Sequence, residues 1–288
     1  MFSYRHGFHA GNHADVLKHM VLVQSLKHLL AKEKPFWVID THAGGGFYDL
    51  TSGYAAKSGE AEGGIHTLWA HRSDQGMPAA VRAYLDQVTV VNDGDALRSY
   101  PGSPQIAAQM LRAGDHLRLY ELHPTEVTVL HKHFADVRKG ITIHEADGFA
   151  NLKGCLPPPT RRGLVLIDPP FENKDDYKRV VQTLRDMVPR FESGTYAIWY
   201  PEVARHESRQ LPDQLKRLMT AFPKLDWLHA TLRVKAASPD GLGLFGSGMF
   251  VINPPWTLYD RLAEALPWLV ETLGLDDHAA YTLEAHQN

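Results

Sequence analysis

Hydrophobic residues recur at helical spacing near the beginning of the chain, in "HADVLKHMVLVQSLKHLLAKEKP" (13–35). The apolar positions are Val16, Leu17, Met20, Val21, Val23, Leu26, Leu29 and Leu30. This spacing predicts an amphipathic helix that ends before Pro35. The apolar "FWVID" (36–40) that follows predicts a short strand, and "THAGGGFYDL" (41–50) predicts a glycine-rich turn.

From residue 116 onward, short apolar runs alternate with segments of helical period. Strands are predicted at 116–122, 141–146, 164–170, 195–201, 227–234 and 249–255, and helices at 124–134, 176–191 and 211–222. Strands that alternate with helices need crossover connections, which place neighbouring strands parallel. The predicted fold class is therefore α/β, with a mostly parallel sheet and helices on both faces.

The range 50–104 is polar and rich in turn residues, as in "TSGYAAKSGEAEGG" and "VNDGDALRSYPGSP". Short helical patterns lie between these turns, so we expect a helical insertion subdomain there. The 288 residues, of which 44% are hydrophobic, can bury one large core, which predicts a single domain over 1–288. Residues 1–34 are expected to form an N-terminal arm and helix.

Charge and cysteine content narrow the function classes. A formal net charge of -3 excludes a chain that is basic throughout, although a basic face can still bind nucleic acid. Cys155 is the only cysteine, which excludes an internal disulfide and a cysteine-rich zinc site and fits a reducing cytosol. The N-terminal residues lack the apolar core of an export signal, so we expect a cytoplasmic protein.

Chemically informative side chains follow successive predicted strands, at the edge where an open parallel sheet binds its ligands. His42 and three glycines follow the first strand and form either a tight turn or a loop that approaches a cofactor. Glu121 follows the second, where it is either an acid for ribose hydroxyls or a surface carboxylate. Asp147 and Gly148 follow the third and either meet the adenine of a cofactor or form an ordinary turn.

The fourth of these strands ends at Asp168, followed by Pro169, Pro170 and Phe171. Two successive prolines remove two backbone donors, so the strand cannot continue and its carbonyls stay free. Asp168 and the Pro169 carbonyl can accept both hydrogens of an exocyclic amine and align its nitrogen for attack. An exposed Phe171 ring is expected to stack on a base turned into the pocket. A strand stopped by Pro-Pro with a capping aspartate is the plain structural alternative.

This order of groups resembles a class I S-adenosylmethionine-dependent methyltransferase of the amino type, whose signature is (D/N/S)PP(Y/F/W). The resemblance to one family, the bacterial large-subunit ribosomal RNA (adenine-N6)-methyltransferase J family, extends along essentially the whole chain. It is carried by "SYRHGFHAGNHADVLKH", "DTHAGGG", "YPGSP", "YELHP", "ADGF", "RRGLVLIDPPF" and "GSGMFVINPPW". The resemblance implies a Rossmann-like fold with a seven-stranded sheet, S-adenosyl-L-methionine as cofactor and 23S ribosomal RNA as partner.

The resemblance also implies roles for single residues. The catalytic acid falls on Asp168. The implied cofactor contacts are His19, His42, Ser103, Glu121, Asp147, Gly148 and Asp168. The implied substrate-binding residues are Tyr4, His6, Lys18, Pro169 and Phe171. The chain departs from the family pattern at two places. Phe171 stands where tyrosine is common, which puts only a hydrogen bond in doubt. Gly45 and Phe47 alter the usual form of the first loop without removing a named contact.

A second match to the signature lies in "VINPPW" (251–256). The last strand of this fold is expected to run antiparallel, so its carboxyl end emerges at the edge opposite the cofactor. We therefore reject Asn253 as a catalytic residue.

The N-terminal histidines His6, His9, His13 and His19 raise a metal site as a rival interpretation. Their spacing lacks the Glu of a zinc protease motif and no cysteine assists, so we expect no metal. The basic residues of this segment are instead expected to contact RNA phosphates, unless they form an ordinary solvated face. They are Arg5, Lys18, Lys27, Lys32 and Lys34. A second candidate RNA surface is the glycine-rich loop 233–248, through Arg233 and Lys235, with an ordinary long loop as the alternative.

The hypothesis that follows is methyl transfer from S-adenosylmethionine to N6 of an adenine in 23S ribosomal RNA, without a covalent enzyme intermediate. Nothing marks Cys155 as a nucleophile. DNA adenine and protein glutamine also present planar amines and remain alternative substrates. A noncatalytic RNA-binding factor is a third hypothesis, against which the intact Asp168, Glu121 and Asp147 argue.

Overall fold

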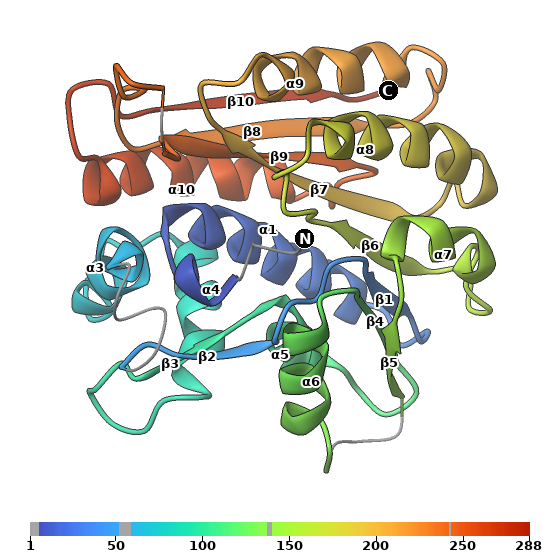
Figure 1. The fold of residues 1–288 in the computed structure, drawn as a ribbon, viewed down its shortest axis with the longest axis horizontal. Coiled ribbons are helices and arrows are strands. Elements are labelled where there is room, and N and C mark those ends of the chain that lie inside the picture. The colour runs from blue at the N-terminus through green and yellow to red at the C-terminus, as the bar shows by residue number, and fades with distance from the viewer. Residues whose placement is uncertain (1–5, 52–58, 137–139, 242) are drawn as a thin grey trace.

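A central sheet organises the computed structural model, which describes residues 6–51, 59–136, 140–241 and 243–288 (Figure 1). Within these residues the sheet has eight strands in the order β10-β8-β9-β7-β6-β1-β4-β5. The strands are β1 (Trp37–Asp40), β4 (His116–Glu121), β5 (Ile141–Glu145), β6 (Gly163–Ile167), β7 (Thr195–Glu202), β8 (Trp227–Arg233), β9 (Gly246–Ile252) and β10 (Ala280–His286). The expected number of seven strands was wrong. The additional strand is β10, at the edge of the sheet, which the sequence pattern did not predict. Nearly all its residues are exposed, so it lacks the alternation of a half-buried strand.

The sheet is mostly parallel, as predicted. β1 pairs in parallel with β4 and β6, β4 with β5, and β6 with β7. β9 lies antiparallel between β7 and β8, and β10 pairs antiparallel with β8. The carboxyl ends of β1, β4, β5, β6 and β7 therefore lie at one edge of the sheet, and the carboxyl end of β9 lies at the opposite edge.

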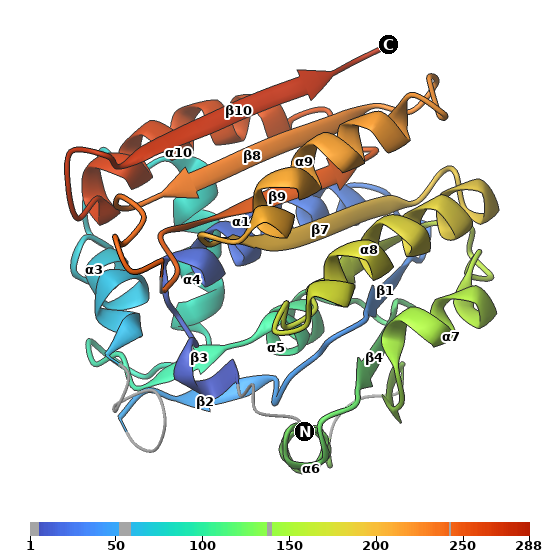
Figure 2. The same ribbon diagram turned by 45° about the horizontal axis from the view of Figure 1, so that its top comes forward.

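Side chains that alternate along the strands bury two separate hydrophobic layers. In β1, Val38 belongs to one layer and Ile39 to the other. The Val38 side is covered by α1 (His13–Leu30), α5 (Ser103–Met110), α6 (Pro124–His133) and α10 (Leu258–Leu273). The Ile39 side is covered by α7 (Gly148–Cys155), α8 (Lys174–Met187) and α9 (His206–Met219), as Figure 2 shows. The sheet is thus enclosed by helices on both faces.

The first long helix, α1, departs from the expectation of an amphipathic helix. Fifteen of its 18 residues are buried, including the polar Asp15, Lys18 and His19. The reason is that α1 is covered on both sides, because it packs on β7, β8 and β9 and is itself covered by α4 (Ala79–Thr89) and α10. Its buried polar residues consequently need partners inside the protein.

The range 50–104 contains η2 (Glu60–Gly63), α3 (Ile65–Ala70), α4 and β3 (Ser99–Pro101). β3 pairs with β2 (Phe47–Asp49) in a small second sheet. Apolar residues of this range, such as Ile65 and Tyr84, join the same buried layer as α1. Among the helices of the described ranges, none combines the length and apolar character needed to cross a membrane.

Candidate active site

A cavity of about 320 Å³ opens at the carboxyl ends of β1, β4, β5 and β6. Its volume lies at the lower end of the range for small-molecule sites. Every residue expected to contact the cofactor lines it: His19, His42, Ser103, Glu121, Asp147, Gly148 and Asp168. The structure thus brings together side chains that are far apart in the sequence.

Glu121 is fixed at the end of β4 by backbone donors. The Gly44 amide donates to its Oε2 at 2.7 Å, and the Leu122 and His123 amides donate to its Oε1 at 2.8 and 2.7 Å. Burial raises the pKa of this carboxyl group, while these amides act in the opposite direction. Gly44 has a φ of 60°, a conformation that glycine adopts without strain, and this orients its amide toward Glu121. The glycine loop therefore holds an acid in the cavity wall.

Asp40 holds a residue that lines the cavity, and it was not identified as a site residue from the sequence. It ends β1, is 1% exposed, and accepts a hydrogen bond of 2.7 Å from the Ser103 hydroxyl. Burial raises its pKa to about 6, against the opposing effect of the Ser103 hydrogen bond. Asp40 thereby orients Ser103, which lines the cavity. A carboxylate that ends an otherwise apolar strand was the available signal.

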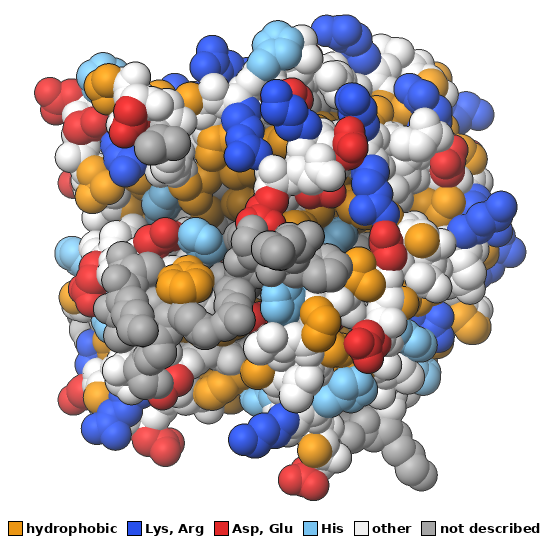
Figure 3. All heavy atoms as spheres, in the orientation of Figure 1, with side chains coloured by type: hydrophobic (Ala, Val, Ile, Leu, Met, Phe, Trp, Pro, Cys, Tyr) orange, Lys and Arg blue, Asp and Glu red, His pale blue; other side chains and the backbone are white. Residues whose placement is uncertain are grey.

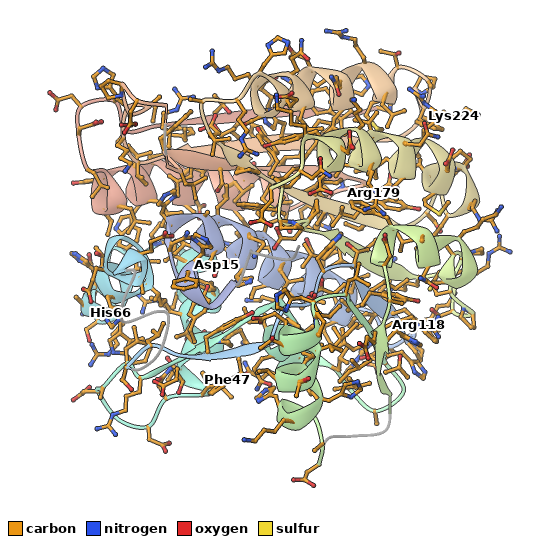
Figure 4. All side chains as sticks on the ribbon, viewed as in Figure 1. Asp15, Phe47, His66, Arg118, Arg179 and Lys224 are labelled. Atoms are coloured by element: carbon orange, nitrogen blue, oxygen red, sulfur yellow. The ribbon has the colours of Figure 1, made fainter. Side chains whose placement is uncertain are left out.

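Asp147 occupies the N-cap of α7 and is held from two directions. It accepts from the Ala150 amide at 3.2 Å and from the Arg179 guanidinium on α8. Burial alone would raise the pKa of the Asp147 carboxyl group. The two donors outweigh burial, so the pKa of Asp147 lies below its ordinary value. Figure 4 labels Arg179, which the sequence did not single out and which also lines the cavity. The neighbouring His42 is neutral because burial lowers its pKa to about 3.

Gly148 lies at a close approach of α7 to the backbone after β1. A Cβ at this position would lie 2.1 Å from the Thr41 carbonyl oxygen. We expect Gly148→Ala to lower the free energy of unfolding by about 1–3 kcal/mol, because backbone cannot move aside cheaply. Urea unfolding measures this change. The control is Gly154→Ala in the same helix, where nothing lies within 4 Å of the added carbon. Equal stability of the two variants would contradict the packing argument.

Asp168 is paired with a buried lysine that comes from α1. Lys18 Nζ lies 2.6 Å from Asp168 Oδ2 and 2.8 Å from Asp15 Oδ1. Burial disfavours the ammonium, but the two carboxylates outweigh this and raise the pKa of Lys18, so it stays charged. Lys18 is only 3% exposed, so the expectation that it contacts RNA phosphates is wrong. It instead fixes one oxygen of Asp168 at the cavity.

Phe171 does not present the exposed ring that the sequence suggested. Its φ is 52°, an uncommon conformation for a bulky residue, and its side chain is 3% exposed. The ring turns inward, with its centroid 4.6 Å from that of Tyr177 and 6.0 Å from that of Trp199. Pro169 is also buried, whereas Pro170 is exposed and lines the cavity. The expected stacking surface is therefore absent in this arrangement of the Asp-Pro-Pro-Phe turn.

The remaining N-terminal predictions have different outcomes. Tyr4 and the side chain of His6 lie outside the described residues. His9 contacts Glu60 at 2.9 Å, and the same carboxylate accepts from the Asn12 side chain. Within the described part of the chain, no cluster of three or more potential metal ligands occurs. His9 thus serves to join η2 to the start of α1.

Asn253 follows β9 at the edge opposite the cavity, as predicted from its antiparallel direction. Its side chain donates to the carbonyls of Glu192 and Gly194 at 2.6 and 2.8 Å. The second Pro-Pro motif thus closes a structural turn.

A mostly parallel sheet whose strand ends carry a glycine loop, two carboxylates and an Asp-Pro-Pro-Phe turn in one cavity defines a class I methyltransferase. The chain belongs to the family described as Ribosomal RNA large subunit methyltransferase D, RlmJ, whose model matches residues 33–284. Two curated relatives, both named Ribosomal RNA large subunit methyltransferase J, are 45% identical to it. The Haemophilus influenzae protein aligns over 99% of this chain and 98% of its own length, and the Escherichia coli protein over 93% of each. The crystal structure of LPL1258 from Legionella pneumophila is 32% identical, with a TM-score of 0.84 over 96% of this chain and 98% of that chain.

Proposed function

We propose that this enzyme transfers a methyl group from S-adenosylmethionine to N6 of a specific adenine in 23S ribosomal RNA. The observation that carries the proposal is the presence of Asp168 in the same cavity as Glu121 and Asp147. Acceptors for an amine and for the polar groups of a nucleoside cofactor then lie within one site. The names of the curated relatives support a ribosomal RNA substrate.

The cavity residues fit the polar groups of the proposed cofactor. The Glu121 carboxylate, preoriented by three amides, can accept from ribose hydroxyls. Asp147, which is held by Arg179, can accept from the exocyclic amine of the cofactor adenine. Bound S-adenosylmethionine supplies an electrophilic methyl group. His19, His42, Ser103 and Gly148 complete the cavity wall.

The substrate amine is held by its two hydrogens, because its lone pair is delocalised into the base. Asp168 and the carbonyl of Pro169 accept these hydrogens, align the nitrogen and stabilise the positive charge that develops on it. Lys18 binds Oδ2 of Asp168, so Oδ1 remains available to accept a hydrogen bond from the substrate amine. Tyr4 and His6 remain proposed substrate-binding residues. Stacking by Phe171 requires its ring to leave the buried position.

Methyl transfer from labelled S-adenosylmethionine to unmodified 23S ribosomal RNA, followed by nucleoside analysis, tests the proposal. Label in N6-methyladenosine supports it, and label in another nucleoside overturns the adenine-N6 assignment. Competition with duplex DNA and with protein substrates separates the alternatives on the same fold, DNA adenine and protein glutamine. If only one of these competitors becomes labelled, the RNA assignment fails and the methyltransferase assignment stands.

Glu121→Gln is expected to weaken cofactor binding by about 10- to 100-fold, because an amide has a single oxygen for the three backbone donors and the ribose. Isothermal titration with S-adenosylmethionine measures the Kd. The control is Glu145→Gln, an exposed acid directly opposite Glu121 on the neighbouring strand. Similar losses in both variants would show that net charge, and not the position of Glu121, governs affinity.

A further inference from the structure

A second cavity, of about 400 Å³, opens beside the proposed active site at the ends of β7 and β8. The aromatic and ionisable residues that line it are Tyr200, Glu202, Arg209, Arg233, Phe245 and His278. Figure 3 shows Lys and Arg side chains gathered over α8 and α9 on this face of the molecule. The methyl-transfer site described above uses none of these six residues.

The walls of this cavity suit a planar, polar ligand. The guanidinium of Arg233 lies over the Phe245 ring, 5.3 Å from its centroid. The same guanidinium donates to both oxygens of Glu202, at 3.3 and 3.1 Å. Aromatic rings and guanidinium planes are the surfaces on which unstacked bases of single-stranded RNA stack. Because Arg233 is already neutralised by Glu202, the cavity interior favours a base over a phosphate.

The second cavity is joined to the active site through the loop that follows β7. Glu202, the last residue of β7, and Val203, the first residue of this loop, both line the second cavity. Arg205 of the same loop donates to the carbonyls of Phe171 and Glu172 at 3.0 and 3.1 Å. Glu172 lines the active-site cavity. Three strand spacings separate β6 from β8, which is roughly 14 Å, so one RNA segment can occupy both cavities.

We propose that the second cavity binds an unpaired base of the substrate RNA that lies close in sequence to the target adenine. The inference rests on the proposed function, since it assumes an RNA substrate. The base stacks on the wall formed by Arg233 and Phe245. Glu202 accepts only, so it selects a base with an exocyclic amine, such as cytosine, over uracil, which presents a carbonyl oxygen there. The exposed Arg209 at the rim is placed to contact the adjacent phosphate.

Binding of short oligocytidylate and oligouridylate to the full chain tests this subsite without the methyl-transfer reaction. We expect oligocytidylate to bind about fivefold more tightly or better. Glu202→Gln should remove this preference, because an amide can also donate to uracil. Phe245→Leu should weaken oligocytidylate binding about fivefold or more by removing the stacking face. Arg217→Ala, an exposed arginine of α9 that does not line the cavity, should change neither value.

Methylation of 23S ribosomal RNA by the same variants separates the inference from the proposed function. Phe245→Leu should raise the KM for RNA while kcat and the Kd for S-adenosylmethionine stay near their original values. Equal oligonucleotide affinities, or an unchanged KM in Phe245→Leu, overturn the subsite even if the unaltered enzyme methylates the RNA. Absence of RNA methylation by the unaltered enzyme, with the cytosine preference intact, overturns the proposed function and leaves an RNA-binding cavity. Melting temperatures of the variants identify any loss caused by misfolding.

Discussion

Asp168→Asn is expected to lower the turnover of methyl transfer by about 10³-fold. The amide has nearly the same shape, so the turn after β6 should be preserved. However, it replaces one oxygen by a nitrogen that donates, and it removes the negative charge that stabilises the developing positive charge on the substrate nitrogen. Asp168 already shares Oδ2 with Lys18, so the amide cannot satisfy both the lysine and the amine. Single-turnover assays with labelled cofactor report the chemical step directly.

The matched control for this variant is Asp175→Asn, an exposed acid on α8 that does not line the cavity. The Kd for S-adenosylmethionine should change little in Asp168→Asn, because Glu121 and Asp147 supply the proposed polar contacts to the cofactor. A fall in turnover below tenfold would exclude Asp168 as the principal acceptor. A loss of cofactor binding as large as the loss of turnover would assign Asp168 to the cofactor instead of the substrate amine.

The sheet edge that carries the site could be predicted because its signals are local. An apolar run that stops at Asp168, and others that stop before Glu121 and Asp147, place each group at a strand end. Parallel strands then bring all three ends to the same edge. Neither step requires knowledge of distant contacts. The antiparallel direction of β9, in contrast, was expected only from the fold that the family resemblance implies.

The parts of the site that escaped prediction depend on contacts between distant segments. Lys18 looked like a surface cation because nothing near it in the sequence shows that α1 would be covered on both sides. Arg179 meets Asp147 only after α7 and α8 pack together. The ring of Phe171 turns inward because its backbone adopts a positive φ. No neighbouring glycine in the sequence indicates this backbone conformation. Sequence pattern thus identified which groups carry the chemistry, whereas packing decided how they are held.

Lys18→Met is expected to lower the free energy of unfolding by about 3–5 kcal/mol. Methionine fills a similar volume but removes the buried ammonium that Asp15 and Asp168 share. Urea unfolding measures the loss. The control is Lys27→Met, which changes an exposed lysine of the same helix. A loss below about 1 kcal/mol, within the range of a surface ion pair, would contradict burial of this pair.

The loss in Lys18→Met should also depend on pH. Lys18 itself has a raised pKa, so in the unaltered protein its contribution is present at all pH values below the ordinary pKa of lysine, about 10.4, and disappears as the pH rises above its folded value. Lys18→Met lacks this contribution at every pH, so its deficit relative to the unaltered protein should be complete at about pH 7.5 and smaller at about pH 11, where the unaltered protein begins to lose the contribution. A deficit that is equal at both pH values would mean that the lost packing of the lysine stem, and not the lost ion pairs, destabilises the variant. The pH dependence therefore separates the electrostatic role of Lys18 in holding Asp168 from its role as a core side chain.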